Sequence, residues 1–389
     1  MQADYVILGA GPTGCTIGIL LARAGRDVLL LDRESPAMIQ VGESLLPSCG
    51  EVFDELGIDM SGFLEKHGVV FTDKGRSARY PFNEALRTDR VVAWQTPRNE
   101  LDERMRKVAL EAGCRFQCCN VTDVELPVVQ TDQGPVTANK LFIDAGGRSQ
   151  FLARKFGTRR GHPLLKNGAI TAWFTGVKPQ PPEVEGDIAA CRYEGGWFWF
   201  IPFADGRWSV GTTISKGGPS GANRFEKAVA LCPEAAVRLE GAEQVQPFRG
   251  AADISASAEK FYGEGWVMAG DAATFLDPIF SSGVTLGLHS GRSLARTILA
   301  SDTAEALATG LERWEQELRD AVKAFEPVVL SYYEGKFLDL TFVDRSKQQE
   351  TVRKAIISLL AGDVFDPEFD APRRFGKRLD SIHRMVIGT

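Results

Sequence analysis

Residues 5–14 read YVILGAGPTG, a short apolar run that leads directly into three spaced glycines, Gly9, Gly11 and Gly14. A continuous apolar run of this kind is typical of a parallel strand that is buried on both faces. The G-x-G-x-x-G spacing after a strand allows a tight turn and lets the backbone approach a pyrophosphate closely. The stretch therefore predicts the first strand and the phosphate-binding turn of a dinucleotide-binding domain.

The residues that follow complete the expected unit. Residues 15–24 are apolar like a packed helix, Gly25 closes it, and residues 28–31 form a second apolar run that ends in Asp32. The positive end of such a helix faces the pyrophosphate, and an acid after the second strand reaches a ribose hydroxyl. The unit fits NAD and FAD equally. Its candidate cofactor-binding residues are Gly9, Gly11, Pro12, Gly14, Asp32 and Arg33.

The rest of the chain alternates between elements of this domain and elements of another. Helical periodicity is found over residues 96–112 and 283–299, and apolar strand-like runs over 114–118, 140–143 and 265–269. Between residues 169 and 210 the pattern is aromatic and interrupted by Gly and Pro, which predicts a separate antiparallel sheet. From residue 304 to residue 383 the pattern is helical, with expected breaks at Pro327, Gly335 and Gly362.

Composition and charge exclude several classes of protein. The chain has 389 residues, 44% of them hydrophobic, and a net charge of -6, which disfavours nucleic acid as a partner. Its seven cysteines include no C-x-x-C pair, so we predict neither a disulfide framework nor a metal site. We find no targeting signal and no apolar stretch of membrane-spanning length, and we expect a cytoplasmic protein.

Six segments carry a family resemblance. Residues 9–14, 144–149 (DAGGRS) and 270–273 (GDAA) resemble the signatures of the para-hydroxybenzoate-hydroxylase-type flavoproteins. Residues 41–47 (VGESLLP), 197–202 (WFWFIP) and 275–283 (FLDPIFSSG) are similar to segments of flavin-dependent halogenases. The last two match W-x-W-x-I-P and F-x-x-P-x-x-S-x-G at every fixed position.

The resemblance implies an α/β fold: a discontinuous Rossmann-like FAD-binding domain, an inserted antiparallel-sheet substrate domain and a helical C-terminal tail. We assign the FAD-binding domain to residues 1–75, 95–160 and 262–302. The substrate domain takes residues 76–94 and 161–261, and the helical region residues 303–389.

The resemblance also implies further cofactor contacts. Segment 41–47 would form a strap over the FAD, Arg98 would lie along it, and Asp271 would bond a ribityl hydroxyl. For Arg98 the alternative is a solvated helix-terminal arginine, and for the strap it is an ordinary turn before Pro47. The candidates implied in this way are Glu43, Ser44, Arg98, Asp144, Gly270, Asp271, Pro278, Gly283 and Val284.

Segment 275–283 would also hold the halide. In the halogenases, backbone amides just before a helix bind chloride or bromide beside the flavin, as the partial positive charge of a helix N-terminus allows. The matching amides here belong to Ser282 and Gly283. Simple packing of a glycine against the flavin ring is the alternative.

Lys66 is the candidate catalytic residue, because the halogenases carry a lysine in this place before an apolar strand. A buried amine would lose its charge preference and capture or hold hypohalous acid. The alternative is an exposed helix end at residues 65–67. Trp197 and Trp199 would wall the substrate pocket and also serve as core, since they alternate along one strand. Phe280 takes the place of a glutamate found in the tryptophan-specific branch, and so resembles the phenol and pyrrole branch.

The sequence therefore predicts a FAD-dependent halogenase that acts on an electron-rich aromatic substrate. It would use reduced FAD from a separate flavin reductase, together with oxygen and chloride or bromide. The substrate would be a small aromatic compound, free or tethered to a carrier. Two alternatives stay open: a FAD-dependent monooxygenase or related flavin oxidoreductase on the same fold, and a non-catalytic flavin-binding partner protein.

Overall fold

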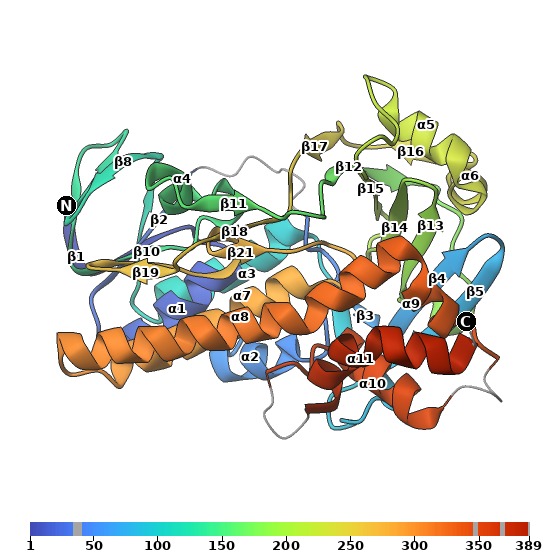
Figure 1. Cartoon of the computed structure of the whole chain (residues 1–389). Helices are drawn as coiled ribbons and strands as arrows, with labels where there is room; N and C mark the ends of the chain where they lie inside the picture. Colours follow the sequence, from blue (N-terminus) through green and yellow to red (C-terminus); the bar gives the residue numbers. More distant parts are fainter. Residues whose placement is uncertain (34–40, 345–348, 366–369, 388–389) are drawn as a thin grey trace.

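Two β-sheets organise the chain, and a helical C-terminal region packs along both of them (Figure 1). The structure, a computed structural model, describes residues 1–33, 41–344, 349–365 and 370–387. The mixed α/β architecture confirms the predicted fold class. None of the described helices is long and apolar enough to cross a bilayer.

The first sheet forms the Rossmann-like part of the fold. Its strands run in the order β19-β20-β10-β1-β2-β7, and β1 lies parallel to both of its neighbours. These strands are β1 (Gln2–Leu8), β2 (Val28–Asp32), β7 (Arg115–Cys118), β10 (Val136–Asp144), β19 (Tyr262–Gly263) and β20 (Trp266–Met268). β8 (Val121–Glu125) and β9 (Val128–Thr131) extend β10. The strands expected at 114–118, 140–143 and 265–269 therefore exist.

Three helices pack together beside this sheet: α1 (Pro12–Arg23), α3 (Arg98–Glu111) and α7 (Ser282–Leu299). α1 begins at Pro12, earlier than the predicted residue 15, because proline is favoured in the first turn of a helix, where its missing N–H costs nothing. The helices predicted at 96–112 and 283–299 correspond to α3 and α7. The glycine turn therefore sits directly between β1 and α1.

The second sheet runs in the order β16-β12-β15-β14-β13-β4-β5. Its strands are β4 (Gly68–Asp73), β5 (Arg76–Pro81), β12 (Gly168–Thr175), β13 (Ile188–Tyr193), β14 (Gly196–Pro202), β15 (Trp208–Ile214) and β16 (Glu243–Gln244), with β17 (Arg249–Ala251) beside β12. β12 to β15 pair antiparallel, as the aromatic pattern predicted. α5 (Arg224–Leu231) and α6 (Pro233–Leu239) follow β15 in the chain.

β4 is part of the second sheet although it comes early in the chain. It pairs in parallel with β13, from Val69 opposite Ile188 to Asp73 opposite Arg192. Residues 68–73 therefore belong to the second sheet, although the sequence boundary at residue 75 assigned them to the FAD-binding domain. Parallel pairing joins strands that are distant in sequence, so the local periodicity of residues 68–73 could not show that they pair with β13.

Short strands and helices connect the two sheets. They are α2 (Cys49–Leu56), β3 (Leu64–Lys66), β6 (Ala93–Gln95), α4 (Phe151–Lys155), β11 (Arg159–Gly161), β18 (Ala256–Ala258) and β21 (Thr274–Phe275). Short 3-10 turns lie at Phe82–Glu84, Gly147–Ser149, Pro182–Val184 and Gly270–Ala272.

The helical tail consists of α8 (Ala304–Glu334), α9 (Lys336–Thr341), α10 (Glu350–Ala361) and α11 (Asp370–Ile387). Gly335 and Gly362 end helices in the left-handed conformation, as predicted. The expected break at Pro327 is wrong, because α8 continues through it. Gly376 of α11 approaches this turn so closely that an added Cβ would lie 2.9 Å from Ala324 O and 3.5 Å from Pro327 Cγ. Tertiary packing of α11 on α8 thus outweighs the local cost of proline, about 3 kcal/mol.

Candidate active site

Two glycines of the turn between β1 and α1, Gly9 and Gly14, leave no room for a side chain. Gly9 has a φ of +99°, and a Cβ there would lie 2.3 Å from Ala145 O. A Cβ on Gly14 would lie 1.9 Å from Gly9 O. No side chain caps the N-terminus of α1, where Pro12 follows Gly11. The positive N-terminal end of α1 is therefore open to an anionic group placed over the glycine turn.

Asp32 is held in place at the end of β2. Its Oδ2 accepts a hydrogen bond from Ala10 N at 2.7 Å, and its Oδ1 accepts one from Arg33 N at 2.8 Å. The carboxylate thus lies beside the glycine turn, as a ribose-binding acid would. The Arg33 side chain is exposed.

Arg98 lies where the glycine turn, the strap and α7 meet. Its Nη1 donates to Val41 O at 3.0 Å, and its Nε and Nη2 bond both oxygens of Asp102. Added Cβ atoms show how close the surroundings are: one on Gly42 would lie 2.8 Å from Arg98 Nη1 and 3.1 Å from Val284 Cγ2. The solvated arginine of the alternative interpretation is excluded, since only 9% of Arg98 is exposed.

Two further acids predicted to contact the cofactor differ in their surroundings. Asp144 is fully buried, and its two oxygens accept the backbone N–H groups of Gly146 and Leu152, both at 2.9 Å. These two hydrogen bonds of Asp144 stabilise the turn that follows β10. Desolvation raises the pKa of Asp271 to about 6, against the charges of Arg148 and Arg98. Gly270 before it has a φ of +60°, and a Cβ there would lie 2.5 Å from Thr13 Oγ1.

The strap pairs with β6. Thr96 N donates to Glu43 O at 2.7 Å, Leu45 N donates to Trp94 O at 3.0 Å, and Ser44 forms a bridge with Gln95. The Glu43 side chain is buried and accepts a hydrogen bond of 2.7 Å from Trp173 Nε1. Desolvation raises the pKa of its carboxyl to about 7. An ordinary surface turn would not bury these groups.

Lys66 lies in β3, which pairs antiparallel with β6 and places Lys66 opposite Ala93. It ends strand β3 rather than a helix, and it is fully buried, which excludes the exposed helix end. Its Nζ donates to Ser44 Oγ at 3.0 Å and to Leu45 O at 2.8 Å, and it lies 5.4 Å from the centre of the Phe82 ring. Desolvation lowers the pKa of Lys66 to about 7, because burial disfavours the ammonium.

Segment 275–283, the predicted halide motif, forms the turn that starts α7. Ser281 N donates to Pro278 O at 3.1 Å, and Ser281 adopts a left-handed φ of +54° before the helix begins at Ser282. No side chain caps this N-terminus. A helix that starts in this way leaves the amides of Ser282 and Gly283 to bind an anion.

The two tryptophans of β14 lie on one face of the second sheet, as their alternation predicted. Their ring centres are 5.5 Å apart, and both rings are buried. Gly211 on β15 makes room for Trp199, since a Cβ on Gly211 would lie 2.2 Å from Trp199 Cζ2. Trp199 Nε1 donates to Ser209 Oγ at 3.3 Å.

A buried polar network was missed by the sequence analysis. The hydroxyl of Tyr333 donates to Asp277 Oδ2 at 2.9 Å, accepts from Trp197 Nε1 at 3.1 Å and lies 3.1 Å from Thr213 Oγ1. Asn167 Nδ2 donates to the same Asp277 oxygen at 3.2 Å. Burial raises the pKa of Asp277 to about 6. The position of Asp277, the one charged residue of segment 275–283, was the only sign of this network in the sequence, and nothing marked Tyr333.

Aromatic rings fill the space between the second sheet and the helical tail. Phe280 lies 5.3 Å from Phe337 and 6.1 Å from Tyr332, and Phe71 lies 5.5 Å from Phe337. The Tyr332 hydroxyl is buried and has no hydrogen-bond partner in the described part of the chain. Phe280 thus faces an apolar surrounding.

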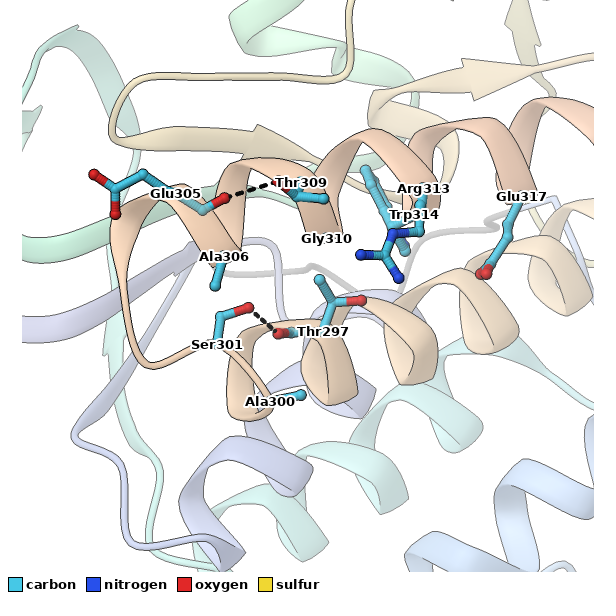
Figure 2. Close-up of a pocket in the computed structure, with 10 residues that line it drawn as sticks. All are labelled: Thr297, Ala300, Ser301, Glu305, Ala306, Thr309, Gly310, Arg313, Trp314 and Glu317. Atoms are coloured by element: carbon cyan, nitrogen blue, oxygen red, sulfur yellow. Dashed lines mark hydrogen bonds between the residues drawn. The ribbon is translucent and has the colours of Figure 1, made fainter.

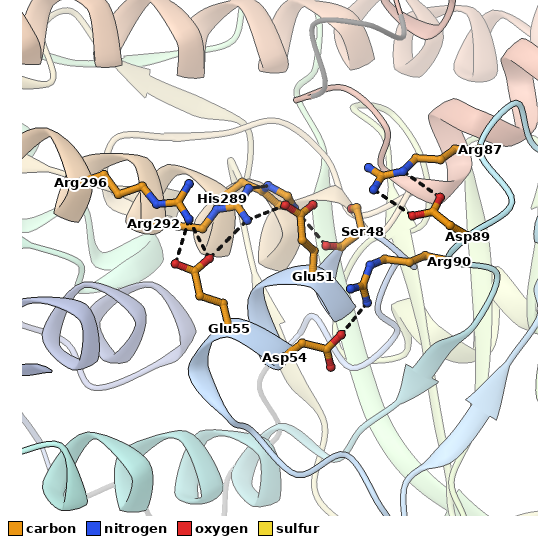
Figure 3. Close-up of polar contacts among 10 residues, drawn as sticks. All are labelled: Ser48, Glu51, Asp54, Glu55, Arg87, Asp89, Arg90, His289, Arg292 and Arg296. Atoms are coloured by element: carbon orange, nitrogen blue, oxygen red, sulfur yellow. Dashed lines mark hydrogen bonds and ion pairs between the residues drawn. The ribbon is translucent and has the colours of Figure 1, made fainter.

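Ion pairs tie α2, which follows the strap, to α7 (Figure 3). Arg292 Nη1 lies 2.8 Å from Glu51, and Arg296 Nη2 lies 2.9 Å from Glu55. His289 Nε2 lies 3.1 Å from Ser48 O, and burial lowers the pKa of His289 to about 4. These contacts fix the end of the strap relative to the helix that begins at the halide motif.

A hollow of about 510 Å³ lies elsewhere, between the end of α7 and the start of α8 (Figure 2). Thr297, Arg313 and Glu317 are among its lining residues, and it includes none of the candidate site residues. The described residues also contain no cluster of three or more His, Cys, Asp or Glu side chains suited to a metal. The candidate site residues therefore lie away from this hollow.

The comparison with protein families decides the identity. The model of the family described as tryptophan halogenase matches residues 4–80 and 68–362. The chain belongs to this halogenase family. The halogenase is thus a FAD-dependent oxidoreductase that uses halide and acts on an electron-rich aromatic substrate, which confirms the principal functional prediction.

Two curated relatives span nearly the whole halogenase. A 1H-pyrrole-2-carbonyl-[peptidyl-carrier protein] chlorinase from Pseudomonas fluorescens is 29% identical over 98% of this chain and 92% of its own. The corresponding brominase from Pseudoalteromonas luteoviolacea is 28% identical, over 98% of this chain and 97% of its own.

Solved structures agree on the fold. A flavoprotein/dehydrogenase from Cytophaga hutchinsonii superposes with a TM-score of 0.87 at 26% identity, covering 100% of the halogenase and 99% of its own chain. A flavin-dependent brominase superposes with a TM-score of 0.84 at 25% identity, covering 99% and 100%. Similarity therefore extends over both sheets and the tail.

The residues around the glycine turn, the start of α1 and Arg98 fit the binding of FAD. Gly9 and Gly14 leave backbone where side chains would collide, α1 offers an uncapped N-terminus, and Arg98 supplies a buried cation beside the strap. Backbone amides, a helix N-terminus and a guanidinium are the groups that bind a pyrophosphate.

Proposed function

We propose that Lys66 carries the oxidised halogen from the FAD to the aromatic ring. When bound, reduced FAD would give two electrons to oxygen, and the resulting peroxide-level oxidant would take two electrons from halide, which yields hypohalous acid and water. The observation that supports Lys66 is its full burial with a pKa lowered to about 7, which leaves much of the amine neutral at neutral pH. A neutral amine has a lone pair that can accept the halogen or hold the acid by a hydrogen bond.

The hydrogen bonds of Lys66 orient this amine. Ser44 Oγ and Leu45 O accept two N–H groups, at 3.0 and 2.8 Å, which directs the lone pair away from the strap. Because Glu43 and Ser44 are adjacent, the same strap reaches both the cofactor side and the lysine. We assign Lys66 the catalytic role and Ser44 that of a positioning residue.

The start of α7 would supply the halide site. The amides of Ser282 and Gly283 stand at an uncapped helix N-terminus, which favours an anion. Pro278 shapes the turn, and Val284, close to Gly42, would pack against the flavin. Gly9, Gly11, Pro12, Gly14, Asp32, Arg33, Glu43, Arg98, Asp144, Gly270 and Asp271 would complete the cofactor site.

Trp197, Trp199 and Phe280 would separate the flavin from the substrate. All three rings are buried among other aromatic rings. Such a wall keeps water and bulky substrate from the flavin, so that oxygen is not transferred directly to the ring.

The aromatic ring would be presented on a carrier protein. Support comes from the two relatives named for carrier-bound pyrrole, which this chain matches along almost their whole length. A separate flavin reductase would supply reduced FAD, since the sequence contains a single strand-linked G-x-G-x-x-G fingerprint. The unpaired state of all seven cysteines, each in the described part of the chain, supports a reducing cytoplasm.

The test is a product screen by mass spectrometry with FAD, a flavin reductase, NADH, oxygen and bromide or chloride. Phenols, indoles and pyrrole-2-carbonyl thioesters serve as substrates. Lys66→Met should lose at least about a thousandfold in halogenation while still oxidising reduced FAD. Lys74→Met, which changes an exposed lysine nearby, is the matched control and should keep wild-type activity.

Two outcomes would contradict the proposal. Halogenation by Lys66→Met at a wild-type rate would remove the catalytic role of this residue. A product that gains oxygen and no halogen would show that the oxidant reaches the ring directly.

A further inference from the structure

The last helix, α11, carries a cationic face on an acidic protein. Its residues Asp370–Ile387 include five arginines and lysines but only two aspartates, whereas the whole chain has a net charge of -6. Phe375 and Leu379 are buried on its inner side. The outer side exposes Arg374, Lys377, Arg378, Ser381, Arg384 and Met385. The spacing of three and four residues places these side chains in one stripe along the helix.

Most charges of this stripe have no counter-charge among the residues that the structure describes. Arg374 pairs with Asp370 one turn away, and Asp380 is paired with Lys336 at 3.0 Å. Lys377, Arg378 and Arg384 form no ion pair within the described part of the chain. Three exposed cations on one rigid helix repel one another, and a carboxylate-rich surface would relieve that repulsion.

α9 lies between the stripe on α11 and the aromatic residues that line the candidate site. α11 packs along α8 and α9 (Figure 1), and His383 Nε2 lies 3.3 Å from Asp339 Oδ2 of α9. In α9, Phe337 packs against Phe280 of the halide motif, with ring centres 5.3 Å apart. A protein bound on α11 would therefore sit close to the end of the site where the substrate ring is expected.

We propose that Arg374, Lys377, Arg378 and Arg384 of α11 dock the acidic surface of the carrier protein that presents the aromatic ring. This inference rests on the proposed function, in which the substrate is tethered. A stripe of exposed cations steers an acidic partner and raises its association rate, and the effect weakens as salt screens the charges. The docked carrier would then direct its flexible prosthetic arm past α9.

The experiment compares two forms of one ring in the full-length halogenase with its reductase. One is pyrrole-2-carbonyl on a phosphopantetheinylated peptidyl carrier domain, and the other is the same acyl group on N-acetylcysteamine. The variant is Lys377→Glu with Arg378→Glu and Arg384→Glu. The control, Lys216→Glu with Arg249→Glu, reverses two exposed cations on the substrate domain.

The triple variant should lose roughly tenfold or more in kcat/KM for the carrier-bound ring, through a higher KM. Its kcat/KM for the small thioester and its FAD content should equal those of wild type, which also shows that it folds. The loss should shrink as salt is raised, and the control should behave as wild type. Equal carrier kcat/KM in the triple variant and wild type overturns the docking surface alone. Turnover of only the small thioester by wild type overturns the carrier substrate, and the docking surface with it.

Discussion

The hydroxyl of Tyr333 donates a hydrogen bond of 2.9 Å to Asp277 Oδ2, and through it the last turn of α8 is joined to the halide motif. The same hydroxyl accepts from Trp197 Nε1 at 3.1 Å. Its neighbour Tyr332 is equally aromatic, yet the Tyr332 hydroxyl is buried with no partner in the described part of the chain. Two adjacent tyrosines thus differ in what their hydroxyl groups contact.

Replacing each tyrosine by phenylalanine separates these roles. Tyr333→Phe should lower the free energy of unfolding by about 1–3 kcal/mol, because Asp277 and Trp197 each lose a hydrogen-bond partner. Tyr332→Phe should be neutral or slightly stabilising, since the removed hydroxyl had nothing to bond. Urea denaturation of the FAD-loaded protein measures both. A loss of the same size in Tyr332→Phe would mean that its hydroxyl is satisfied.

The pKa of Lys66 makes stability depend on pH. It is about 7 in the folded protein and near 10.5 in the unfolded chain, so between these values the unfolded chain binds more protons. The contribution of Lys66 to stability therefore rises with pH and is lost as the pH falls toward 7. The unfolding free energy of wild type minus that of Lys66→Met should grow by about 2 kcal/mol from pH 7 to pH 9. Lys74→Met is the control, and its difference from wild type should stay constant over the same range.

Phe280→Glu tests whether the residue at this position alone decides if the enzyme accepts free tryptophan. The carboxyl group would enter a site lined by the apolar faces of the Phe337 and Tyr332 rings. We expect a loss of about 3–5 kcal/mol in stability and no gain of activity on free tryptophan. Thermal denaturation and a tryptophan assay decide this. Brominated tryptophan from a stable variant would show that the surrounding pocket already fits that substrate.

Arg98→Lys should weaken FAD binding. The planar guanidinium bonds both oxygens of Asp102 and the carbonyl of Val41 at once, and an ammonium cannot reproduce that geometry. The Kd for FAD, measured by flavin fluorescence, should rise at least about tenfold. Arg104→Lys, on the same helix but away from the strap, should leave the Kd unchanged. An unchanged Kd in Arg98→Lys would assign the arginine to the fold alone.

The sequence predicts the structure correctly where neighbouring residues alone determine it. Residues 5–14 predict β1 and the turn before α1, since strand, glycine spacing and helix are all local features. The alternation of Trp197 and Trp199 likewise predicts that both rings share a face. Gly335 and Gly362 end helices because only glycine adopts the left-handed conformation at little cost.

Features that depend on distant contacts could not be predicted. β4 joins β13 across more than a hundred residues, Pro327 is carried inside α8 by packing from α11, and Tyr333 finds Asp277 only in the folded chain. The burial of Lys66 is a similar case. Its neighbours Glu65 and His67 are charged or polar and exposed, so the local pattern also fitted a solvated end.

The route of α8 has a consequence for the order in which the enzyme is made. Residues 1–302, which include the glycine turn, Lys66 and the start of α7, leave the ribosome before Tyr332 and Tyr333 of α8. A chain interrupted before the end of α8 would lack the ring of Tyr332 beside Phe280 and the hydroxyl of Tyr333 that bonds Asp277. The surroundings of Phe280 and Asp277 are thus completed only when the helical tail has been synthesised.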